Sequence, residues 1–483
     1  MTRSEADWRP ICLDMANAKI VVTLGPASET PETVTALIHA GAQIFRMNAS
    51  HGPWEQHQQR IETVRDAEKE TGKPVGILLD LQGPKIRLGK FETGKCTLET
   101  GASFTITTEE TLGDTQRAST TYKDFARDVR PGDRVLLNDG AVTLRARSGN
   151  TVAVDFDVLS GGIIGNQKGI NLPGVRVSAP SVTQKDLADL KAGLAAGVDY
   201  VAMSFVRSAL DVHVLRQHIG SARLPIIAKI EKPEAVQDIN AILDVASGIM
   251  VARGDLGVEM SLEMVPPIQK RLIRRARRKN RFVITATQML ESMIENANPT
   301  RAEVSDVANA IYDGTDAVML SAETSVGKFP VNAVEYMVRI AEEAERAIGK
   351  RGYVEMPHIA GASDSDILAD AAFNAARAAD VQAIVVFTDS GYSARLISRY
   401  RPPVRILAMT ASPDTVRRLL VNYGVIPVLA PNALSTDEML GQMDTLLVER
   451  GLLKPGDKVV FVAGQPVGRA GSTNLMKLHR VGA

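Results

Sequence analysis

The stretch Leu224-Pro-Ile-Ile-Ala-Lys-Ile-Glu231 joins an apolar run to a lysine and a glutamate. A second stretch, Gly248-Ile-Met-Val-Ala-Arg-Gly-Asp255, has the same form and ends in an arginine and an aspartate. Each apolar run has the length and continuous burial pattern of a strand in a parallel sheet. We therefore expect the four charged side chains to meet at one edge, although two surface salt bridges would explain these stretches equally well.

Two carboxylates at such an edge suit Mg²⁺ or Mn²⁺, which prefer oxygen ligands and keep open positions for water or substrate. A lysine beside that metal suits the negative charge of a phosphoryl group in transit. The two stretches therefore favour metal-assisted phosphoryl chemistry as the first hypothesis.

Further strand-length apolar runs lie on both sides of these stretches. They fall at 19–24, 42–46, 75–79, 200–204, 282–286 and 317–320. Helical patterns separate them, among them 54–71, 234–243, 267–279 and segments that start at Thr30 and Thr183. Eight successive βα units predict an α/β fold, a (β/α)₈ TIM barrel.

Two regions break this rhythm. Residues 84–177 contain short alternating strands at 96–99, 103–107, 134–137 and 152–156, with a hairpin turn at Asn138-Asp-Gly140. This pattern predicts a small inserted β-barrel domain, which leaves the barrel at its catalytic edge. It would serve as a lid, and a rigid appendage is the alternative. Residues 353–483 predict an open α/β domain with strands at 383–387, 405–409, 425–429 and 458–462. The barrel is then formed by residues 1–83 and 178–352.

Composition excludes several classes of protein. The 483 residues are 45% hydrophobic and 23% charged, with a formal net charge of zero, so neither nucleic acid nor a membrane is the expected partner. The two cysteines, Cys12 and Cys96, lack metal or redox spacing, and Met1–Pro10 lacks a signal-peptide core. The basic helix at 267–279 has no interleaved aromatics and is expected to face solvent or another subunit. A cytoplasmic enzyme fits best.

Polar or charged residues follow most of the predicted barrel strands, at the edge where TIM barrels hold their active sites. They are Arg46, Asn48, Ser50, Asp80, Lys229, Glu231, Arg253, Asp255, Thr287, Gln288, Ser321 and Glu323. This gathering favours a functional site over isolated salt bridges. His51 could be a general base, but it has no evident orienting partner, so we expect it to position a ligand.

Seven segments together resemble the pyruvate kinase family. They are KIVVTLGPAS (19–28), FRMNASHG (45–52), DLQGPKIR (80–87), IAKIE (227–231), IMVARGDLG (249–257), ATQMLESM (286–293) and MLSAET (319–324). The predicted domain order is also similar to that family, and the resemblance covers nearly the whole chain. It implies transfer of a phosphoryl group from phosphoenolpyruvate to ADP, giving pyruvate and ATP, with Mg²⁺ or Mn²⁺ as the metal, in a homotetramer.

The resemblance also assigns roles to residues that match the motifs. Lys229 would stabilise the transferred phosphoryl group, Glu231 and Asp255 would hold the divalent metal, and Thr287 would lie near the carbon that is protonated. The implied substrate contacts are Arg46, Gly254, Asp255 and Thr287. The implied nucleotide contacts are Asn48, His51, Arg87 and Lys185. Ala322 stands where many members have glycine, a mild departure.

The family's monovalent-cation site corresponds to Asn48, Ser50 and Asp80. Members that need potassium have threonine and glutamate at the positions of Leu81 and Lys85, and this chain is instead similar to the potassium-independent group. A tethered ammonium at Lys85 would supply the charge that potassium supplies elsewhere. We therefore expect that potassium is not required.

Two turns of the C-terminal domain predict a site for a phosphorylated effector. They contain Thr388, Ser390 and Ser393 in one segment, and Ser472 and Thr473 in the other. Members activated by a sugar bisphosphate often have lysine where Asp389 stands, so a sugar or nucleotide monophosphate is the expected ligand. Turns of this composition without a ligand are the alternative.

Two other functions remain open at this point. A metal-dependent aldolase or lyase acting on pyruvate enolate would share the metal pair and the arginine but would need neither Lys229 nor a lid. A catalytically silent sensor should have lost Lys229, Glu231 or Asp255, and all three are present.

Overall fold

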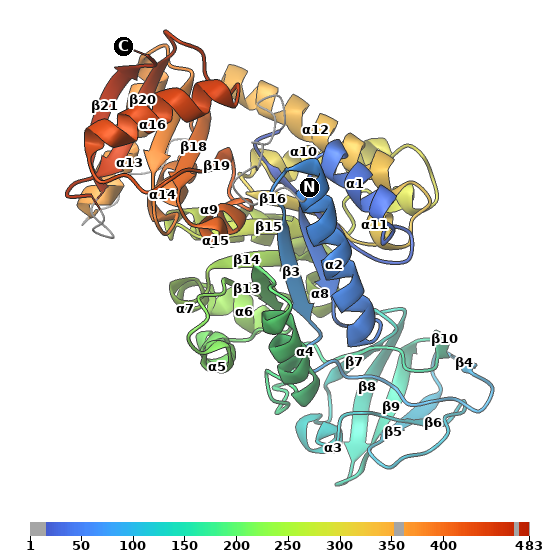
Figure 1. Cartoon of the computed structure of the whole chain (residues 1–483). Coiled ribbons are helices and arrows are strands. Elements are labelled where there is room, and N and C mark those ends of the chain that lie inside the picture. The colour runs from blue at the N-terminus through green and yellow to red at the C-terminus, as the bar shows by residue number, and fades with distance from the viewer. Residues whose placement is uncertain (1–15, 352–361, 468–472, 483) are drawn as a thin grey trace.

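The computed structural model describes residues 16–351, 362–467 and 473–482. Eight parallel strands close into a barrel in the order β1-β16-β15-β14-β13-β12-β3-β2 (Figure 1). They are β1 (Lys19–Thr23), β2 (Ala42–Asn48), β3 (Gly76–Leu81), β12 (Tyr200–Met203), β13 (Ile226–Ile230), β14 (Gly248–Ala252), β15 (Phe282–Ala286) and β16 (Ala317–Leu320). Nearly every residue of these strands is buried, which explains their continuous apolarity. The predicted barrel is confirmed.

Helices surround the barrel and connect successive strands. They are α1 (Pro31–Ala40), α2 (Trp54–Thr71), α4 (Gln184–Ala195), α5 (Ala209–Ile219), α6 (Pro233–Gln237), α7 (Ile239–Val245), α8 (Arg253–Glu259), α9 (Val265–Arg278), α10 (Arg301–Tyr312), α11 (Ala322–Ser325) and α12 (Pro330–Arg351). The predicted starts at Thr30 and Thr183 are confirmed, since both side chains cap the amides that follow them. Among the described residues, no helix combines the length and apolarity needed to cross a membrane.

The single helix predicted over 234–243 is wrong. The structure has two helices, α6 and α7, which meet at Asp238. The Asp238 carboxylate accepts a hydrogen bond from the backbone amide of Ala209, 3.0 Å away at the start of α5. The chain therefore turns at Asp238 to satisfy a tertiary contact that helical periodicity does not report.

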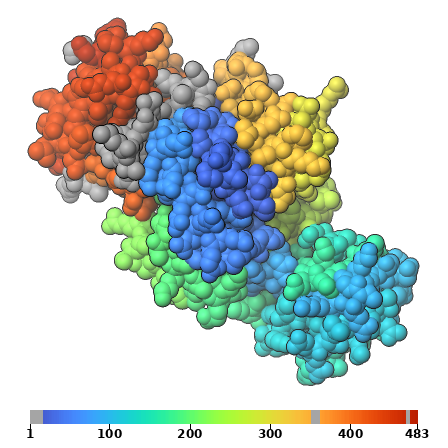
Figure 2. All heavy atoms as spheres, turned by 45° about the vertical axis from the view of Figure 1, so that its right-hand side comes forward, coloured from blue at the N-terminus to red at the C-terminus, as the bar shows by residue number. Residues whose placement is uncertain are grey.

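The inserted lid has two sheets around one apolar core. Strands β11-β7-β8-β9-β5-β6 form one sheet and β10-β4 the other. The elements are β4 (Lys95–Leu98), β5 (Ser103–Thr107), β6 (Arg117–Ser119), α3 (Phe125–Asp128), β7 (Arg134–Leu137), β8 (Val142–Gly149), β9 (Ala153–Ser160), β10 (Gly162–Gly165) and β11 (Ile170–Asn171). Asn138 and Asp139 have positive φ in the predicted hairpin turn. The lid projects from the barrel as a separate lobe (Figure 2).

The C-terminal domain is an open sheet in the order β19-β18-β17-β20-β21. Its elements are α13 (Asp364–Ala378), β17 (Ala383–Phe387), α14 (Tyr392–Ser398), β18 (Arg405–Thr410), α15 (Pro413–Leu419), β19 (Val425–Leu429), α16 (Thr436–Glu449), β20 (Lys458–Gly464) and β21 (Thr473–Arg480). The antiparallel edge strand β21 was not predicted, because most of its side chains are at least partly exposed and it lacks an apolar run. Our limits for the three domains remain predictions.

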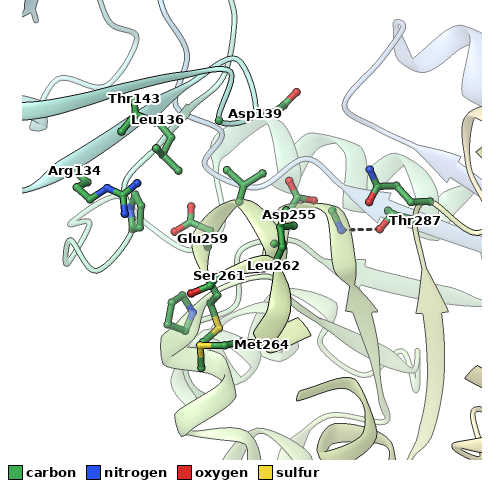
Figure 3. A pocket seen from close by; sticks show the side chains of 18 of the residues that line it. Arg134, Leu136, Asp139, Thr143, Asp255, Glu259, Ser261, Leu262, Met264 and Thr287 are labelled. Atoms are coloured by element: carbon green, nitrogen blue, oxygen red, sulfur yellow. Dashed lines mark hydrogen bonds between the residues drawn. The ribbon is translucent and has the colours of Figure 1, made fainter. Parts of the chain in front are cut away.

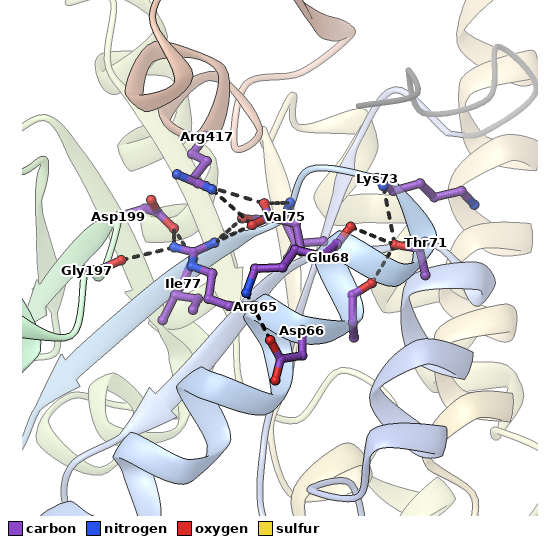
Figure 4. A network of polar contacts seen from close by, with 12 residues as sticks. Arg65, Asp66, Glu68, Thr71, Lys73, Val75, Ile77, Gly197, Asp199 and Arg417 are labelled. Carbon is purple, nitrogen blue, oxygen red and sulfur yellow. Dashed lines mark hydrogen bonds and ion pairs between the residues drawn. The ribbon is translucent and has the colours of Figure 1, made fainter. Parts of the chain in front are cut away.

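Polar contacts tie this domain to the amino-terminal end of the barrel. In Figure 4, the Glu68 carboxylate of α2 forms an ion pair with Arg417 of α15 at 3.0 Å. It also accepts a hydrogen bond from the backbone amide of Val75 at 2.9 Å. Lys19 of β1 donates to the Val425 carbonyl oxygen at 2.8 Å, and Tyr200 donates to the Arg417 carbonyl oxygen at 2.6 Å. The C-terminal domain therefore contacts the barrel at the end opposite the carboxyl ends of its strands.

Candidate active site

A cleft of about 1130 Å³ separates the lid from the carboxyl ends of the barrel strands. Figure 3 shows Arg134, Leu136, Asp139 and Thr143 of the lid across this cleft from the barrel residues. The predicted residues Lys85, Gly254, Asp255, Thr287, Gln288, Ser321 and Glu323 line it as well. The lid and the barrel edge thus face each other, as the predicted lid requires.

Next to this cleft, Lys229 is the centre of a buried polar cluster. Its Nζ lies 2.9 Å from Glu231 Oε1 and 3.4 Å from Asp80 Oδ1, and it donates to Ser204 Oγ at 2.7 Å. All four side chains are at most 9% exposed. The ends of β3 and β13 and the loop after β12 therefore position one ammonium group.

Arg46 joins the same cluster from β2. Its Nε and Nη2 contact Asp80 Oδ2 at 2.8 and 2.7 Å, and its Nη1 donates to Thr23 Oγ1 at 3.0 Å. The register places Asn48 of β2 opposite Asp80 of β3, so both strands end together. Asp80 thus orients both Arg46 and Lys229.

The charges of this cluster set its protonation. Burial alone would raise the pKa of Asp80, but Lys229 and Arg46 outweigh it and lower the pKa below its usual value. Burial likewise opposes a charged Lys229, yet Asp80 and Glu231 raise its pKa above the ordinary value. Lys229 is therefore a permanent cation at neutral pH. Burial, the largest effect, raises the pKa of Glu231, and Asp255 adds to this rise.

Thr287 has an unusual backbone. Its φ is 69°, and that of the next residue, Gln288, is 52°, in the left-handed region that β-branched residues rarely adopt. The Gly254 amide donates to Thr287 Oγ1 at 2.8 Å, and that hydroxyl donates to the Ala286 carbonyl oxygen at 2.6 Å. Strain of this kind collects at functional sites, which supports a role for Thr287.

Two carboxylates of the site could hold a divalent metal. Glu231 is buried, Asp255 lines the cleft, and the charge of Asp255 adds to the rise in the pKa of Glu231 that burial causes. Within the described ranges no group of three or more metal-ligating side chains occurs. The donor set fits Mg²⁺ or Mn²⁺ with substrate and water completing the coordination, and it does not fit a closed structural metal site.

The predicted nucleotide contacts lie near the root of the lid. Lys185 Nζ donates to the Ala49 carbonyl oxygen at 2.7 Å, and Arg87 Nη1 donates to the Gln167 carbonyl oxygen at 3.0 Å. His51 is exposed over much of its surface, and the burial of the rest, followed by the charges of Lys85 and Arg87, lowers its pKa. A neutral His51 beside cations suits contact with an anionic ligand.

Lys85 stands where the chain leaves the barrel for the lid. It is partly buried, lines the cleft, and its charge acts on His51. Its ammonium forms no hydrogen bond or ion pair with the described residues, including Asn48, Ser50 and Asp80. The side-chain oxygen of Asn48 instead accepts a hydrogen bond from the backbone amide of Ser50 at 3.2 Å. Lys85 thus carries an uncompensated charge at the edge of the site.

One predicted edge residue has a different position. Arg253 contacts Asp306 at 2.7 Å and the Thr287 carbonyl oxygen at 2.8 Å, so it braces the loop after β15 and does not join the Lys229 cluster. Sequence reasoning missed Ser204 and Phe205. The Ser204 hydroxyl accepts a hydrogen bond from Lys229, and the Phe205 backbone amide donates one to Glu231. The rule used for the other strands, a polar residue at the strand end, would have found Ser204.

A second pocket, of about 420 Å³, lies in the C-terminal domain. Thr388, Asp389, Ser390, Ser393 and Thr473 line it, and the Ser393 and Thr473 hydroxyls bond to each other. Ser472 lies outside the described residues. The structure therefore brings together the two segments that were predicted to bind an effector.

Comparison with known proteins gives consistent matches. Residues 15–334 match the family model "Pyruvate kinase, barrel domain", and residues 366–479 match "Pyruvate kinase, alpha/beta domain". A pyruvate kinase of Mycobacterium intracellulare is 47% identical over 96% of this chain and 98% of its own length. One from Geobacillus stearothermophilus is 45% identical over 95% of this chain and 80% of its own length. A crystal structure of a pyruvate kinase from Cryptosporidium parvum superposes with a TM-score of 0.88, at 35% identity over 96% of each chain.

Proposed function

The chain belongs to the pyruvate kinase family, whose reaction transfers the phosphoryl group of phosphoenolpyruvate to ADP, and we propose that Lys229, Glu231 and Asp255 are central to that reaction here. The observation that carries the proposal is the placement of Lys229 Nζ 2.9 Å from Glu231 in a buried cluster at the strand ends. A fixed cation there needs no reorganisation as charge develops on the transferred group.

The residues of the site have separate roles in the proposed reaction. Arg46 and Lys229 offer cationic donors to the phosphoryl oxygens, and Asp80 fixes both donors in place. The Gly254 amide holds the Thr287 hydroxyl at 2.8 Å, and this hydroxyl would lie near the pyruvate carbon that is protonated. Because the cluster is buried, its charges act through a low dielectric and with little screening.

Glu231 and Asp255 would hold the Mg²⁺ or Mn²⁺ ion that the family uses. When bound, the ion supplies a positive charge that binds phosphoenolpyruvate and stabilises the enolate. Burial raises the pKa of Glu231, and the charge of Lys229, whose Nζ lies 2.9 Å from Glu231 Oε1, opposes that rise.

Asn48, His51, Arg87 and Lys185 would bind ADP on the lid side of the cleft. Lys85 would supply, after lid closure, the charge that potassium supplies in other members. Its free ammonium and its place at the lid root support this proposal, because a lid motion would carry it toward Asn48, Ser50 and Asp80. Potassium is then dispensable.

One coupled assay tests the function. Pyruvate formation is measured with phosphoenolpyruvate, ADP and Mg²⁺, and then with each reactant omitted. We expect turnover that depends on all three. Pyruvate release without ADP would instead favour a lyase, and no turnover in a folded, metal-binding protein would favour a silent sensor.

The 420 Å³ pocket would bind a phosphorylated regulator. Its hydroxyls at Thr388, Ser390, Ser393 and Thr473 suit phosphate oxygens, and the Asp389 carboxylate disfavours a second phosphate. The test is a screen of sugar and nucleotide monophosphates for changes in activity and melting temperature, with Ser393→Ala as the pocket variant. A screen without any response would count against regulation at this pocket.

We further propose a homotetramer in the cytoplasm, by analogy with the family and its glycolytic reaction. Sedimentation of the full chain tests the assembly.

A further inference from the structure

A small pocket between the barrel and the C-terminal domain is lined by five arginines, which we call the interdomain arginine pocket. Arg277 and Arg281 come from the end of α9 and the turn before β15, while Arg395, Arg399 and Arg401 come from α14 and the loop after it. Asp316 is the carboxylate among the lining residues. Figure 1 shows α9 beside α14 and α15 at this contact.

Two of these arginines have carboxylate partners. Arg399 pairs with Asp366 at 2.7 Å, and Arg401 pairs with Asp316 at 3.0 Å. Burial lowers the pKa of Arg277 and of Arg281, and the charges of Asp316 and Asp244 oppose this without forming an ion pair with them. Five arginines therefore lie near three carboxylates, those of Asp244, Asp316 and Asp366, and net positive charge remains.

Arg277, Arg281 and Arg395 have no carboxylate within ion-pair distance among the described residues. Arg277 donates to the Arg399 carbonyl oxygen at 3.0 Å. Arg281 donates to the Leu243 carbonyl oxygen at 2.8 Å, and Arg395 to the Ser390 carbonyl oxygen at 3.0 Å. Backbone carbonyls satisfy hydrogen bonds but do not neutralise three cations.

Burial makes this arrangement unfavourable without an anion. Two effects lower the pKa of Arg277 and of Arg395 to about 10: burial is the larger, and the charge of a neighbouring arginine is the next. The neighbours are Arg401 for Arg277 and Arg281 for Arg395. Desolvated cations that repel each other are stable in proteins when an anion pairs with them.

The pocket also contains donors that lack acceptors. Arg399 and Arg401 are 5% and 6% exposed, and the Nε of each has no hydrogen-bond partner among the described residues. Buried N–H groups are nearly always satisfied, so these donors indicate a missing acceptor.

We propose that the interdomain arginine pocket binds a phosphate dianion, either free or carried by a small metabolite. A tetrahedral dianion offers several acceptor oxygens to planar guanidinium groups, which bind phosphate in bidentate fashion. Its two charges would offset the excess of five arginines over the carboxylates of Asp244, Asp316 and Asp366. This site is separate from the catalytic cleft and from the hydroxyl-lined pocket around Thr388.

Such an anion would join the two domains, because its ligands come from both. Binding to the folded state alone raises stability with ligand concentration. Helix α14 also connects the two C-terminal pockets, since Tyr392 and Ser393 line one and Arg395 lines the other. Ligands at these pockets are therefore expected to influence each other.

The test compares anion binding in the full chain and in three variants. Arg281→Met and Arg395→Met each remove one unpaired cation and keep much of the side-chain volume. Arg274→Met is the matched control, because Arg274 is exposed on the same helix, α9. Binding of inorganic phosphate is measured by titration calorimetry with the catalytic cleft saturated by phosphoenolpyruvate and Mg²⁺, followed by a hexose monophosphate.

We expect affinity to fall about tenfold to a hundredfold in Arg281→Met and Arg395→Met, the effect of one charge-assisted hydrogen bond, and to be unchanged in Arg274→Met. Equal affinity in all four proteins would overturn the proposal. If the hexose monophosphate binds more tightly and shows the same losses, the ligand is a metabolite; if only inorganic phosphate shows them, it is the free ion.

A second measurement needs no variant. Crystals of the unaltered protein are grown in selenate, whose anomalous signal locates the anion. Selenate among Arg277, Arg281 and Arg395 at millimolar concentration supports the site. A pocket that contains only water, or an adventitious ion seen only at crystallisation concentrations, would overturn it.

Discussion

Lys229 donates a hydrogen bond from Nζ to Ser204 Oγ at 2.7 Å, and Ser204 in turn donates to the Leu81 carbonyl oxygen at 2.8 Å. The ammonium is therefore held from the neighbouring strand end as well as by its carboxylate partners. The hydroxyl fixes the direction of the cation without changing its charge.

Ser204→Ala should slow turnover while leaving substrate affinity nearly unchanged. The lost bond involves a charged group, which contributes about 1.5–3 kcal/mol, so kcat should fall about tenfold to a hundredfold. Steady-state kinetics with varied phosphoenolpyruvate gives kcat and KM separately, and Ser204→Thr should restore part of the rate. A change confined to KM would contradict a positioning role.

Lys229→Met should abolish phosphoryl transfer but keep metal binding. Removing a cation that acts on the transferred group reduces kcat by about three to five orders of magnitude. Mn²⁺ binding followed by electron paramagnetic resonance and the circular dichroism spectrum are the controls for a folded site. Turnover near that of the unaltered enzyme would exclude the role.

Lys85→Glu should lower activity in buffer free of potassium and sodium, and added potassium should restore part of it. The substitution replaces a tethered positive charge by a carboxylate that attracts a cation. The unaltered enzyme should be fully active without potassium. Lys90→Glu, at an exposed lysine of the lid, is the matched control. Many-fold activation of the unaltered enzyme by potassium would refute the proposal.

Lys19 should make the free energy of unfolding rise with pH between about pH 7 and pH 10.5. Burial, followed by the charge of Arg405, lowers the pKa of Lys19 from 10.5 to about 7. Between these values the unfolded chain binds a proton at Lys19 that the folded chain does not, so the free energy of unfolding rises with pH. Below pH 7 both states are protonated, and the full penalty for burying the charge remains.

The pH dependence of unfolding is compared with that of Lys19→Met, whose side chain binds no proton at position 19. Unfolding by urea at pH 6, 8 and 10 should show the unaltered protein gaining stability relative to Lys19→Met as pH rises. Lys69→Met, at an exposed lysine, should show no trend. A constant difference between the unaltered protein and Lys19→Met would mean that Lys19 titrates normally in the folded state.

The sequence predicted what depends on local pattern. Continuous apolar runs identified the barrel strands, and because parallel strands end at a common edge, Lys229, Glu231 and Asp255 could be placed together before any coordinates. Ser204 was missed because a single serine after a strand is a weak signal beside charged neighbours.

Other features depend on contacts between distant residues. The break at Asp238 follows from a bond to Ala209, and Arg401 meets Asp316 across 85 positions of sequence. Arg253 resembled a site residue by position, yet it binds Asp306. Periodicity and spacing contain no information about such pairs, so the interdomain contacts required the structure.

Helix α2 has 18 residues and spans the barrel from edge to edge. Glu68, in its last turns, contacts Arg417, and its first residue follows the loop that begins after Asn48 and contains His51. At 1.5 Å per residue it is a rod about 27 Å long. Because a helix is stiff along its axis, a shift of the C-terminal domain against Glu68 is expected to move the far end of α2 by nearly the same distance. If a ligand of the C-terminal domain causes such a shift, α2 gives it a direct mechanical connection to the loop that contains His51.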